Sequence, residues 1–315
     1  MAEPFELRQW YAELLDALGP EGRALITPVG LAHTVAKYIV NPERKLAADD
    51  LDARDPAFVA QWMRVLRPVA ERYFRWQVSG IEHVPREGPV LLVGSHNGGI
   101  VVSDSALTVL ALWDHLGPSR PVYSLSHDLL HTTATLRSLA RRGGILRAGH
   151  TGAERALRAG HITLVYPGSD LDSTRAFSQR YKIELGGRKG FLKLALRTGV
   201  PIVPVVSAGT HEQFVVLTRG DGLAKLLRTR SWLRLQVFPI VLSLPWGLTS
   251  GLFPYVPLPV QTSLAFGPAI RWPSLSAADA DDPAVLDRCY AEVRDALQRE
   301  MDVVAKGRLP FLGRV

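Results

Sequence analysis

The segment SHNGGIVVSD, residues 95–104, places a histidine and an aspartate in one loop, where they could carry acid–base chemistry. His96 directly follows the apolar run PVLLVG, and Asp104 opens a stretch with helical periodicity. A carboxylate that keeps one ring nitrogen of an imidazole protonated leaves the other free to accept the proton of a hydroxyl group. The pair therefore predicts a general base acting on an alcohol. Taken alone, the loop favours a structural alternative, in which Asp104 caps a helix and His96 is a hydrogen-bonded loop residue.

Two further loops carry cations that suit an anionic group. The segment GSDLDSTR, residues 168–175, follows the apolar run HITLVYP and ends at Arg175, with Arg188 and Lys189 downstream. The segment RGGILR ends at Arg147, before another predicted helix, and this side chain could face the same pocket. Arginine engages a phosphate through two parallel hydrogen bonds. The four cations are candidate phosphate contacts, and a solvated basic surface is the alternative.

Two histidines suggest a different chemistry, a metal-dependent hydrolase. His127 and His131 are four residues apart, which places both on one face of a helix. Zinc would need a third ligand, and the residue after His127 is Asp128 where the usual motif has glutamate. We expect Asp128 to cap a helix and the site to hold no metal.

The elements that must position these loops alternate between strands and helices. Apolar runs predict strands at residues 89–94, 121–125, 162–166, 200–206 and 262–266, and helical periods lie at 104–116, 129–140, 151–159, 190–197 and 283–305. This order predicts an α/β fold with a largely parallel central sheet flanked by helices. Loops at the carboxyl ends of such strands meet at one edge of the sheet.

An N-terminal helical extension, residues 1–77, is expected to precede an α/β domain with a C-terminal helix, residues 78–315. Helical periods cover residues 4–18 and 30–40, and a third helix runs to about Trp76. Asp55 before Pro56 fits the N-cap of that third helix, with proline in its first turn.

Composition narrows the class of partner. The 315 residues carry a formal net charge of +7, which favours an anionic partner such as a nucleic acid, an anionic lipid or a phosphorylated substrate. The basic residues are dispersed and no nucleic-acid-binding motif is present, so no nucleic acid is expected. The sequence lacks the Gly-x-Ser-x-Gly elbow of serine hydrolases, so a classical serine hydrolase is not expected. The single cysteine, Cys289, excludes an internal disulfide and fits a reducing compartment, and the N-terminus does not resemble a secretory signal.

One long uncharged segment, residues 235–260, stands out. Its five prolines would break a helix repeatedly, so no transmembrane helix is expected. We interpret it as a buried or interfacial segment, and an ordinary buried loop and strand explains it equally well.

Taken together and in this order, the segments resemble the glycerophospholipid acyltransferase family, over roughly residues 76–271. Members of that family transfer an acyl chain from coenzyme A or acyl carrier protein to a glycerolipid hydroxyl. His96 and Asp104 are similar to the family's histidine–aspartate block, and GGILR, with Arg147, to its second block. Tyr-Pro-Gly at 166–168, followed by Arg175, is similar to its Phe-Pro-Glu-Gly turn. The downstream run RKGFLKLA and the strand VPIVPV match closely.

Two departures mark a divergent member, nearer to those acting on neutral glycerolipids. Seven residues separate His96 from Asp104, where the family has four, so the loop must bulge for the pair to meet. The glutamate of the third block is also missing, and the first acidic residue after it is Asp170.

The resemblance implies that His96, oriented by Asp104, activates an acceptor hydroxyl for attack on an acyl thioester. Backbone N–H groups near Gly98 or Gly168 would hold the oxyanion, and the arginines would hold a phosphate of the acceptor or the coenzyme. Acyl-CoA or acyl-ACP is the expected co-substrate, with no further cofactor, and the expected location is peripheral, on the cytoplasmic face of a membrane. A catalytically silent lipid-binding protein on the same fold and a thioesterase are the alternatives.

Overall fold

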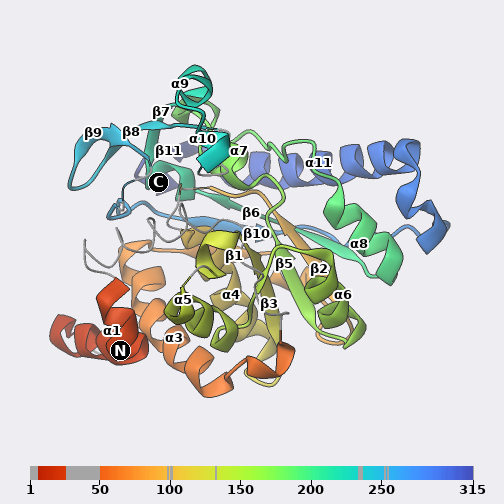
Figure 1. The fold of residues 1–315 in the computed structure, drawn as a ribbon, viewed down its shortest axis with the longest axis horizontal. Coiled ribbons are helices and arrows are strands. Elements are labelled where there is room, and N and C mark those ends of the chain that lie inside the picture. Colours follow the sequence, from red (N-terminus) through yellow and green to blue (C-terminus); the bar gives the residue numbers. More distant parts are fainter. Residues whose placement is uncertain are drawn as a thin grey trace.

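The computed structural model describes residues 6–25, 50–97, 99, 102–131, 133–232, 237–251, 253 and 255–314. Within them lies a seven-stranded sheet of order β1-β10-β6-β2-β5-β3-β4 (Figure 1). Its strands are β1 (Gln77–Ser79), β2 (Val90–Gly94), β3 (Val122–Ser126), β4 (Ile145–Arg147), β5 (Ile162–Val165), β6 (Ile202–Ala208) and β10 (Ser263–Phe266).

The helices that surround this sheet are α1 (Leu7–Leu25), α3 (Pro56–Pro68), α4 (Ser103–Leu116), α5 (Ala134–Arg142), α6 (His150–Arg158), α7 (Ser169–Ser173), α8 (Gly190–Thr198), α9 (Asp221–Leu226), α10 (Thr229–Trp232) and α11 (Pro283–Ala305). The remaining strands are β7 (Val215–Thr218), β8 (Ile240–Ser243) and β9 (Gly247–Ser250), which form a second sheet, and β11 (Arg308–Leu309) and β12 (Gly313–Arg314), which form a C-terminal hairpin.

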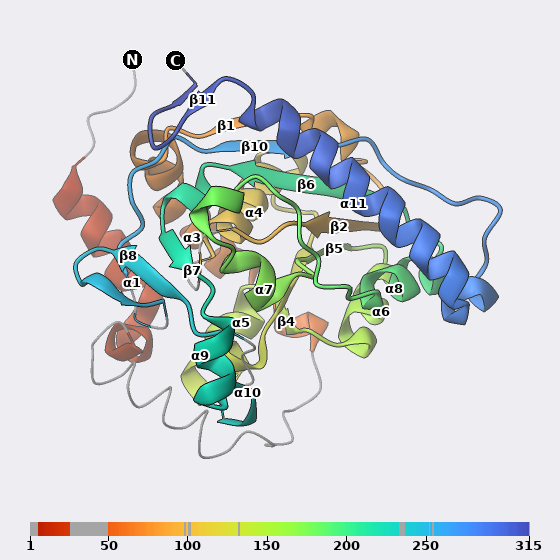
Figure 2. The same ribbon diagram turned by 90° about the horizontal axis from the view of Figure 1, so that it is seen from above.

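Strand β2 lies in the middle of the sheet and is buried on both faces. It pairs in parallel with β5 on one side and with β6 on the other. Leu91 and Val93 pack toward α6, α8 and α11, whereas Val90 and Leu92 pack toward α4. A strand covered on both faces has no polar side, which explains its unbroken apolar sequence. Figure 2 shows α11 running along the sheet beside β6 and β10.

The predicted α/β fold with a largely parallel sheet flanked by helices is confirmed. The antiparallel exception among its pairs is β10 with β6, which follows the long excursion through β7–β9. Strands β1 and β4 were not predicted, because three residues are too few to show a period. The predicted helix at 283–305 is α11.

The N-terminal helices agree in part with the prediction. The backbone of Gly19 is not helical, with φ 65° and ψ 174°, so the first helical segment ends there as predicted, and α1 continues beyond this kink as a second segment to Leu25. Asp55 caps α3 as predicted, its side chain accepting hydrogen bonds from the N–H groups of Ala57 and Phe58. Helix α3 packs on α4 through a cluster that includes Met63 and Leu110. The helix predicted at 30–40 lies outside the described residues.

The uncharged segment at 235–260 contributes two antiparallel strands, β8 and β9, to the second sheet. One face of this sheet is buried through Val216 and Val241, and the other is exposed. The segment is thus a sheet with one buried face and one exposed face rather than a buried loop. Across the described residues, the helices are all too short or too polar to span a bilayer.

Candidate active site

The histidine and the aspartate of the first loop meet. Nδ1 of His96 lies 2.8 Å from Oδ2 of Asp104, in the first turn of α4. The same carboxylate accepts hydrogen bonds from the backbone N–H groups of Asn97, at 2.7 Å, and Ser105, at 2.6 Å. The bulge that the seven-residue spacing requires is therefore present. Asp104 is fully buried and does not act as the N-cap, a position that Val102 occupies.

The ring of His96 is held flat against a tyrosine. The rings of His96 and Tyr166 are stacked, with centroids 4.4 Å apart and planes inclined by 15°. The tyrosine hydroxyl lies 3.0 Å from Oγ1 of Thr108 on α4. A Cβ at Gly94 would lie 2.3 Å from Cε1 of Tyr166, so only glycine at the end of β2 leaves room for that ring. Strand β2 thus supplies the histidine and also the space for the ring that orients it.

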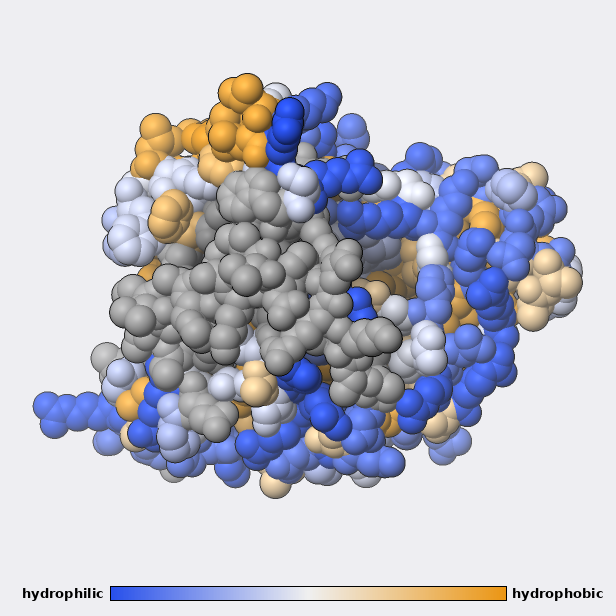
Figure 3. Space-filling model, viewed as in Figure 1, coloured by the Kyte–Doolittle hydropathy of each residue, from blue (hydrophilic) through white to orange (hydrophobic). Residues whose placement is uncertain are grey.

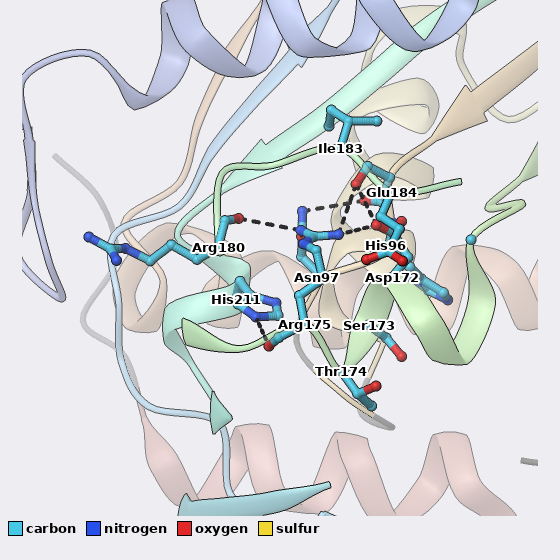
Figure 4. A network of polar contacts seen from close by, with 12 residues as sticks. His96, Asn97, Asp172, Ser173, Thr174, Arg175, Arg180, Ile183, Glu184 and His211 are labelled. Carbon is cyan, nitrogen blue, oxygen red and sulfur yellow. Dashed lines mark hydrogen bonds and ion pairs between the residues drawn. The ribbon is translucent and has the colours of Figure 1, made fainter. Parts of the chain in front are cut away.

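A buried ion pair supports the backbone of the histidine loop. Asp172 of α7 accepts hydrogen bonds from the backbone N–H of His96 and, at 3.1 Å, from the hydroxyl of Ser95. Arg175 pairs with Asp172 and donates to the side-chain oxygen of Asn97 (Figure 4). Asn97 in turn donates to the backbone carbonyl of Ser207 on β6, at 3.0 Å. The ends of β2, β5 and β6 are joined in this way around the loop that carries His96.

Electrostatics suit a base at position 96. Burial opposes protonation of the ring, but the charge of Asp104 and its hydrogen bond outweigh burial, so the pKa of His96 is raised. Burial and the charge of Asp104 raise the pKa of Tyr166 well above 10, so its hydroxyl stays protonated. Burial raises the pKa of Asp172 to about 6, against the opposing charge of Arg175. In the described part of the chain, Nε2 of His96 has no hydrogen-bond partner, and the side chain keeps 17% exposure.

Arg175 corrects one expectation from the sequence. The residue is 1% exposed and its guanidinium is bonded to Asp172 and Asn97, so it does not face a ligand as predicted. Its carbonyl accepts a hydrogen bond from Nε2 of His211, at 2.7 Å, and burial lowers the pKa of that histidine to about 3. A composition argument could not separate this buried arginine from an exposed one.

The other predicted cations are engaged in three different ways. Arg188 donates to the carbonyls of Pro167 and Gly168, at 3.0 and 3.1 Å, and so stabilises the turn after β5. Lys189 pairs with an aspartate of α11 rather than facing the catalytic loop. Arg147 ends β4, three strands from β2 and roughly 15 Å away at the usual spacing. It pairs with Asp128 at 2.6 Å, and its side chain is 44% exposed.

Of the two glycines proposed to flank an oxyanion, Gly168 lies among the described residues. Gly98 lies outside the described residues. Gly168 precedes α7, where a Cβ would lie 2.3 Å from the Glu184 carbonyl oxygen and from Cβ of Asp172. The glycine is required there by close packing of the turn against the segment that follows it.

The predicted arrangement of His127 and His131 as two metal ligands on one α-helical face is not present. His127 precedes a short 3-10 helix, Asp128–His131, so the two histidines do not share one α-helical face. His131 is buried and its Nε2 lies 3.0 Å from Oγ of Ser126. In the ranges that the structure describes, three or more His, Cys, Asp or Glu side chains nowhere gather as a metal would need.

Comparison with known proteins identifies the family of this chain. A sequence model described as Acyltransferase matches residues 75–208, which run from β1 to the end of β6 and include the loops that carry His96 and Asp172. An uncharacterised protein of Mycobacterium tuberculosis is 33% identical over 286 residues, covering 90% of this chain and 77% of that protein. The chain belongs to the acyltransferase family. The matched residues include His96, Asp104 and Arg147.

Two further matches describe the relatives of this acyltransferase. A bovine protein named "DGAT1/2-independent enzyme synthesizing storage lipids" is 27% identical over 156 residues, covering 49% of this chain and 43% of its own length. The solved structure of the 1-acyl-sn-glycerophosphate acyltransferase PlsC from Thermotoga maritima aligns with a TM-score of 0.47 at 14% identity, over 88% of this chain and 96% of that one.

Sequence reasoning missed the two residues that support His96 most closely. Asp172 was not singled out, although it stands three residues before Arg175, the spacing at which an acidic side chain on a helical turn reaches an arginine. Tyr166 was noted only as part of a turn. Its role in this acyltransferase depends on the absence of a side chain at Gly94, across the sheet, which no local pattern reveals.

Proposed function

We propose that the protein transfers a fatty acyl group from a thioester donor, acyl-CoA or acyl-ACP, to a hydroxyl group of a glycerolipid acceptor. The observation that carries this proposal is the 2.8 Å contact between Nδ1 of His96 and Asp104, in the residues that the acyltransferase family model matches. The protein acts as a peripheral protein at the cytoplasmic face of a membrane, where acceptor and product reside.

The proposed reaction needs one proton acceptor and one oxyanion site. Nε2 of His96 takes the proton of the acceptor hydroxyl, and the oxygen attacks the thioester carbonyl. Asp104 keeps Nδ1 protonated and stabilises the imidazolium. The tetrahedral intermediate collapses with cleavage of the carbon–sulfur bond, and the imidazolium protonates the leaving thiolate. Ester and free thiol are the products. Backbone N–H groups beside Gly98 or Gly168 hold the oxyanion, each contributing on the order of 3 kcal/mol.

A neutral glycerolipid is the acceptor that the cations favour. Arg175 is buried in the loop network and Arg188 is bonded to the turn after β5, so two of the predicted phosphate contacts are committed to the fold. Arg147 pairs with Asp128 at the edge of the sheet and is 44% exposed there, and in this proposal its guanidinium contacts a phosphate of the donor. The name of the bovine relative, an enzyme synthesizing storage lipids, supports a lipid substrate.

The test is a product analysis with a labelled long-chain acyl group on either carrier. Lysophosphatidic acid, a lysophospholipid, monoacylglycerol and diacylglycerol are offered as separate acceptors. Label appearing in a glycerolipid ester establishes the transferase and names its acceptor. Label released as free fatty acid without an acceptor shows a thioesterase. An inert protein that still binds vesicles shows a silent lipid-binding protein.

A further inference from the structure

The exposed face of the β7–β8–β9 sheet carries leucines as well as the polar Thr218. Leu242 of β8 and Leu248 of β9 are paired across the strands and are 51% and 67% exposed, and Leu217 of β7 is 53% exposed. The other face packs inward through Val216 and Val241. An antiparallel sheet with one buried face ordinarily carries polar residues on the other. The sheet therefore presents leucines where solvent alone would favour polar side chains.

Two aromatic side chains lie near this face, one in the turn between β8 and β9 and one after β9. The rings of Trp246 and Phe253 lie with centroids 6.3 Å apart, and both side chains are 53% exposed. Leu244 and Val256, joined by a backbone hydrogen bond of 2.9 Å, are exposed beside them. Figure 3 shows hydrophobic residues gathered at the end of the molecule formed by β8, β9 and α9. Contiguous apolar surface of this kind marks an interaction site.

The charged residues next to this face, on α9 and α10, indicate an anionic partner. Residues 237–262 contain no charged side chain, whereas residues 213–232 contain four cations and one acid. Lys225 of α9 and Arg228 and Arg230 after it are exposed, next to the exposed Leu226. An uncharged apolar face with Trp and Phe at its tip and cations beside it matches the depth profile of an anionic bilayer.

The same sheet contacts the catalytic loop. Phe214, at the start of β7, stacks on Tyr255 with centroids 4.2 Å apart. A Cβ at Gly99, three residues after His96, would lie 2.6 Å from the Phe214 ring. A partner bound on the outer face is therefore connected through one layer of aromatic rings to the loop that carries the base. The sheet also lies beyond residues 75–208, which the acyltransferase family model matches.

We propose that the outer face of the β7–β8–β9 sheet docks on an anionic bilayer and holds the loop that carries His96 at the surface of the bilayer. The face consists of Leu217, Leu242, Leu244, Trp246, Leu248 and Phe253. The proposal deepens the proposed function, because a lipid acceptor must reach His96 from the membrane. The cations after α9 contact the headgroups, and the leucines and rings enter the boundary with the acyl chains.

The test is flotation of the full chain with phosphatidylcholine vesicles, with and without phosphatidylglycerol. Wild type is expected to float with vesicles that contain phosphatidylglycerol and less with phosphatidylcholine alone. The double variant Leu242→Glu/Leu248→Glu should lower the partition coefficient by about tenfold or more, the loss that removing one or two leucines from an apolar phase implies. Val303→Glu is the matched control, because Val303 is a 62% exposed apolar residue on α11.

Charge and folding are tested separately. The triple variant Lys225→Glu/Arg228→Glu/Arg230→Glu should abolish the preference for phosphatidylglycerol. Unchanged melting temperatures establish that the variants fold, and thiol release from a water-soluble short-chain acyl-CoA, measured with a water-soluble acceptor present, should stay at the wild-type level. The docking site is overturned if wild type does not float with the vesicles, or if the leucine variant floats like wild type. Neither result bears on acyl transfer, which the product analysis tests separately. Light scattering tests whether the face binds a second copy instead. If wild type is a dimer and the leucine variant is a monomer, the face is a dimer interface, and this result also overturns the proposal.

Discussion

Nδ1 of His96 lies 2.8 Å from Oδ2 of Asp104, although seven residues separate the two along the chain. The two side chains meet despite this spacing because hydrogen bonds fix the backbone at the start of the loop to Asp104 and to Asp172. Asp104 also accepts from the backbone N–H of Asn97, and Asp172 accepts from the backbone N–H of His96. The loops after β2 and β5 therefore support each other, and the lengthened loop still delivers the ring to the carboxylate.

Asp104→Asn should lower kcat by about 10²–10⁴-fold, because an amide neither orients the ring nor stabilises the imidazolium. The charge of Asp104 raises the pKa of His96, and a base acts only when neutral, so activity falls as pH drops through this pKa. Removing the charge should move the acid limb of the kcat profile to lower pH. Asp114→Asn, on the exposed side of the same helix, is the control. An acid limb that stays in place would show that the limb belongs to another group.

Gly94→Ala should disturb the site through Tyr166. The added methyl group would lie 2.3 Å from the ring, which must move off His96, and overpacking of this kind costs about 1–3 kcal/mol of unfolding free energy. We expect a lower melting temperature and a loss of kcat larger than the stability loss explains. Tyr166→Phe keeps the ring and should retain most activity. Gly222→Ala, at a glycine with open space around it, should behave like wild type. A fully active Gly94→Ala would show that the stacked tyrosine is dispensable.

Arg175→Leu should lower the free energy of unfolding by about 3–5 kcal/mol, because it leaves the buried carboxylate of Asp172 without its partner. Urea unfolding measures this change. Arg142→Leu breaks an exposed pair with Asp55 and should change stability little. If Arg175 bound substrate instead, its variant would fold normally and raise KM.

Arg147→Ala should behave in the opposite way. The residue is 44% exposed, so stability should hardly change. Contact with a donor phosphate predicts a raised KM for acyl-CoA with a nearly unchanged kcat, and no change in the KM for a neutral acceptor. Steady-state kinetics with each substrate varied in turn measures the two constants. An unchanged KM for both substrates would remove Arg147 from the site.

Asp172 should leave a signature in the pH dependence of stability. Burial raises its pKa from 3.8 to about 6, so the folded state binds this proton more tightly than the unfolded state. The stabilisation from this group is fully present below pH 4 and is lost as pH rises through about 6. Asp172→Asn should therefore gain stability relative to wild type between pH 4 and pH 6. Denaturant unfolding across that range is the measurement, and parallel curves would contradict the raised pKa.

The sequence predicted the layers of the fold, because buried strands and amphipathic helices leave periodic patterns. It named His96 and Asp104, and it stated that their loop had to bulge. It did not predict that Arg175 is buried, since charge alone does not tell a ligand contact from a structural ion pair. Nor did it predict Asp172 beneath the backbone of His96, or the space at Gly94 that Tyr166 fills. Those contacts depend on neighbouring strands that only the folded chain brings together.

The most direct test of acyl transfer by His96 is thiol release from a long-chain acyl-CoA or acyl-ACP, measured with and without a glycerolipid acceptor for wild type and His96→Ala. We predict release by wild type that depends on the acceptor, with ester formed in equal amount, and a loss of at least 10²-fold in His96→Ala at an unchanged melting temperature. A folded His96→Ala variant that retains wild-type transfer would contradict this prediction.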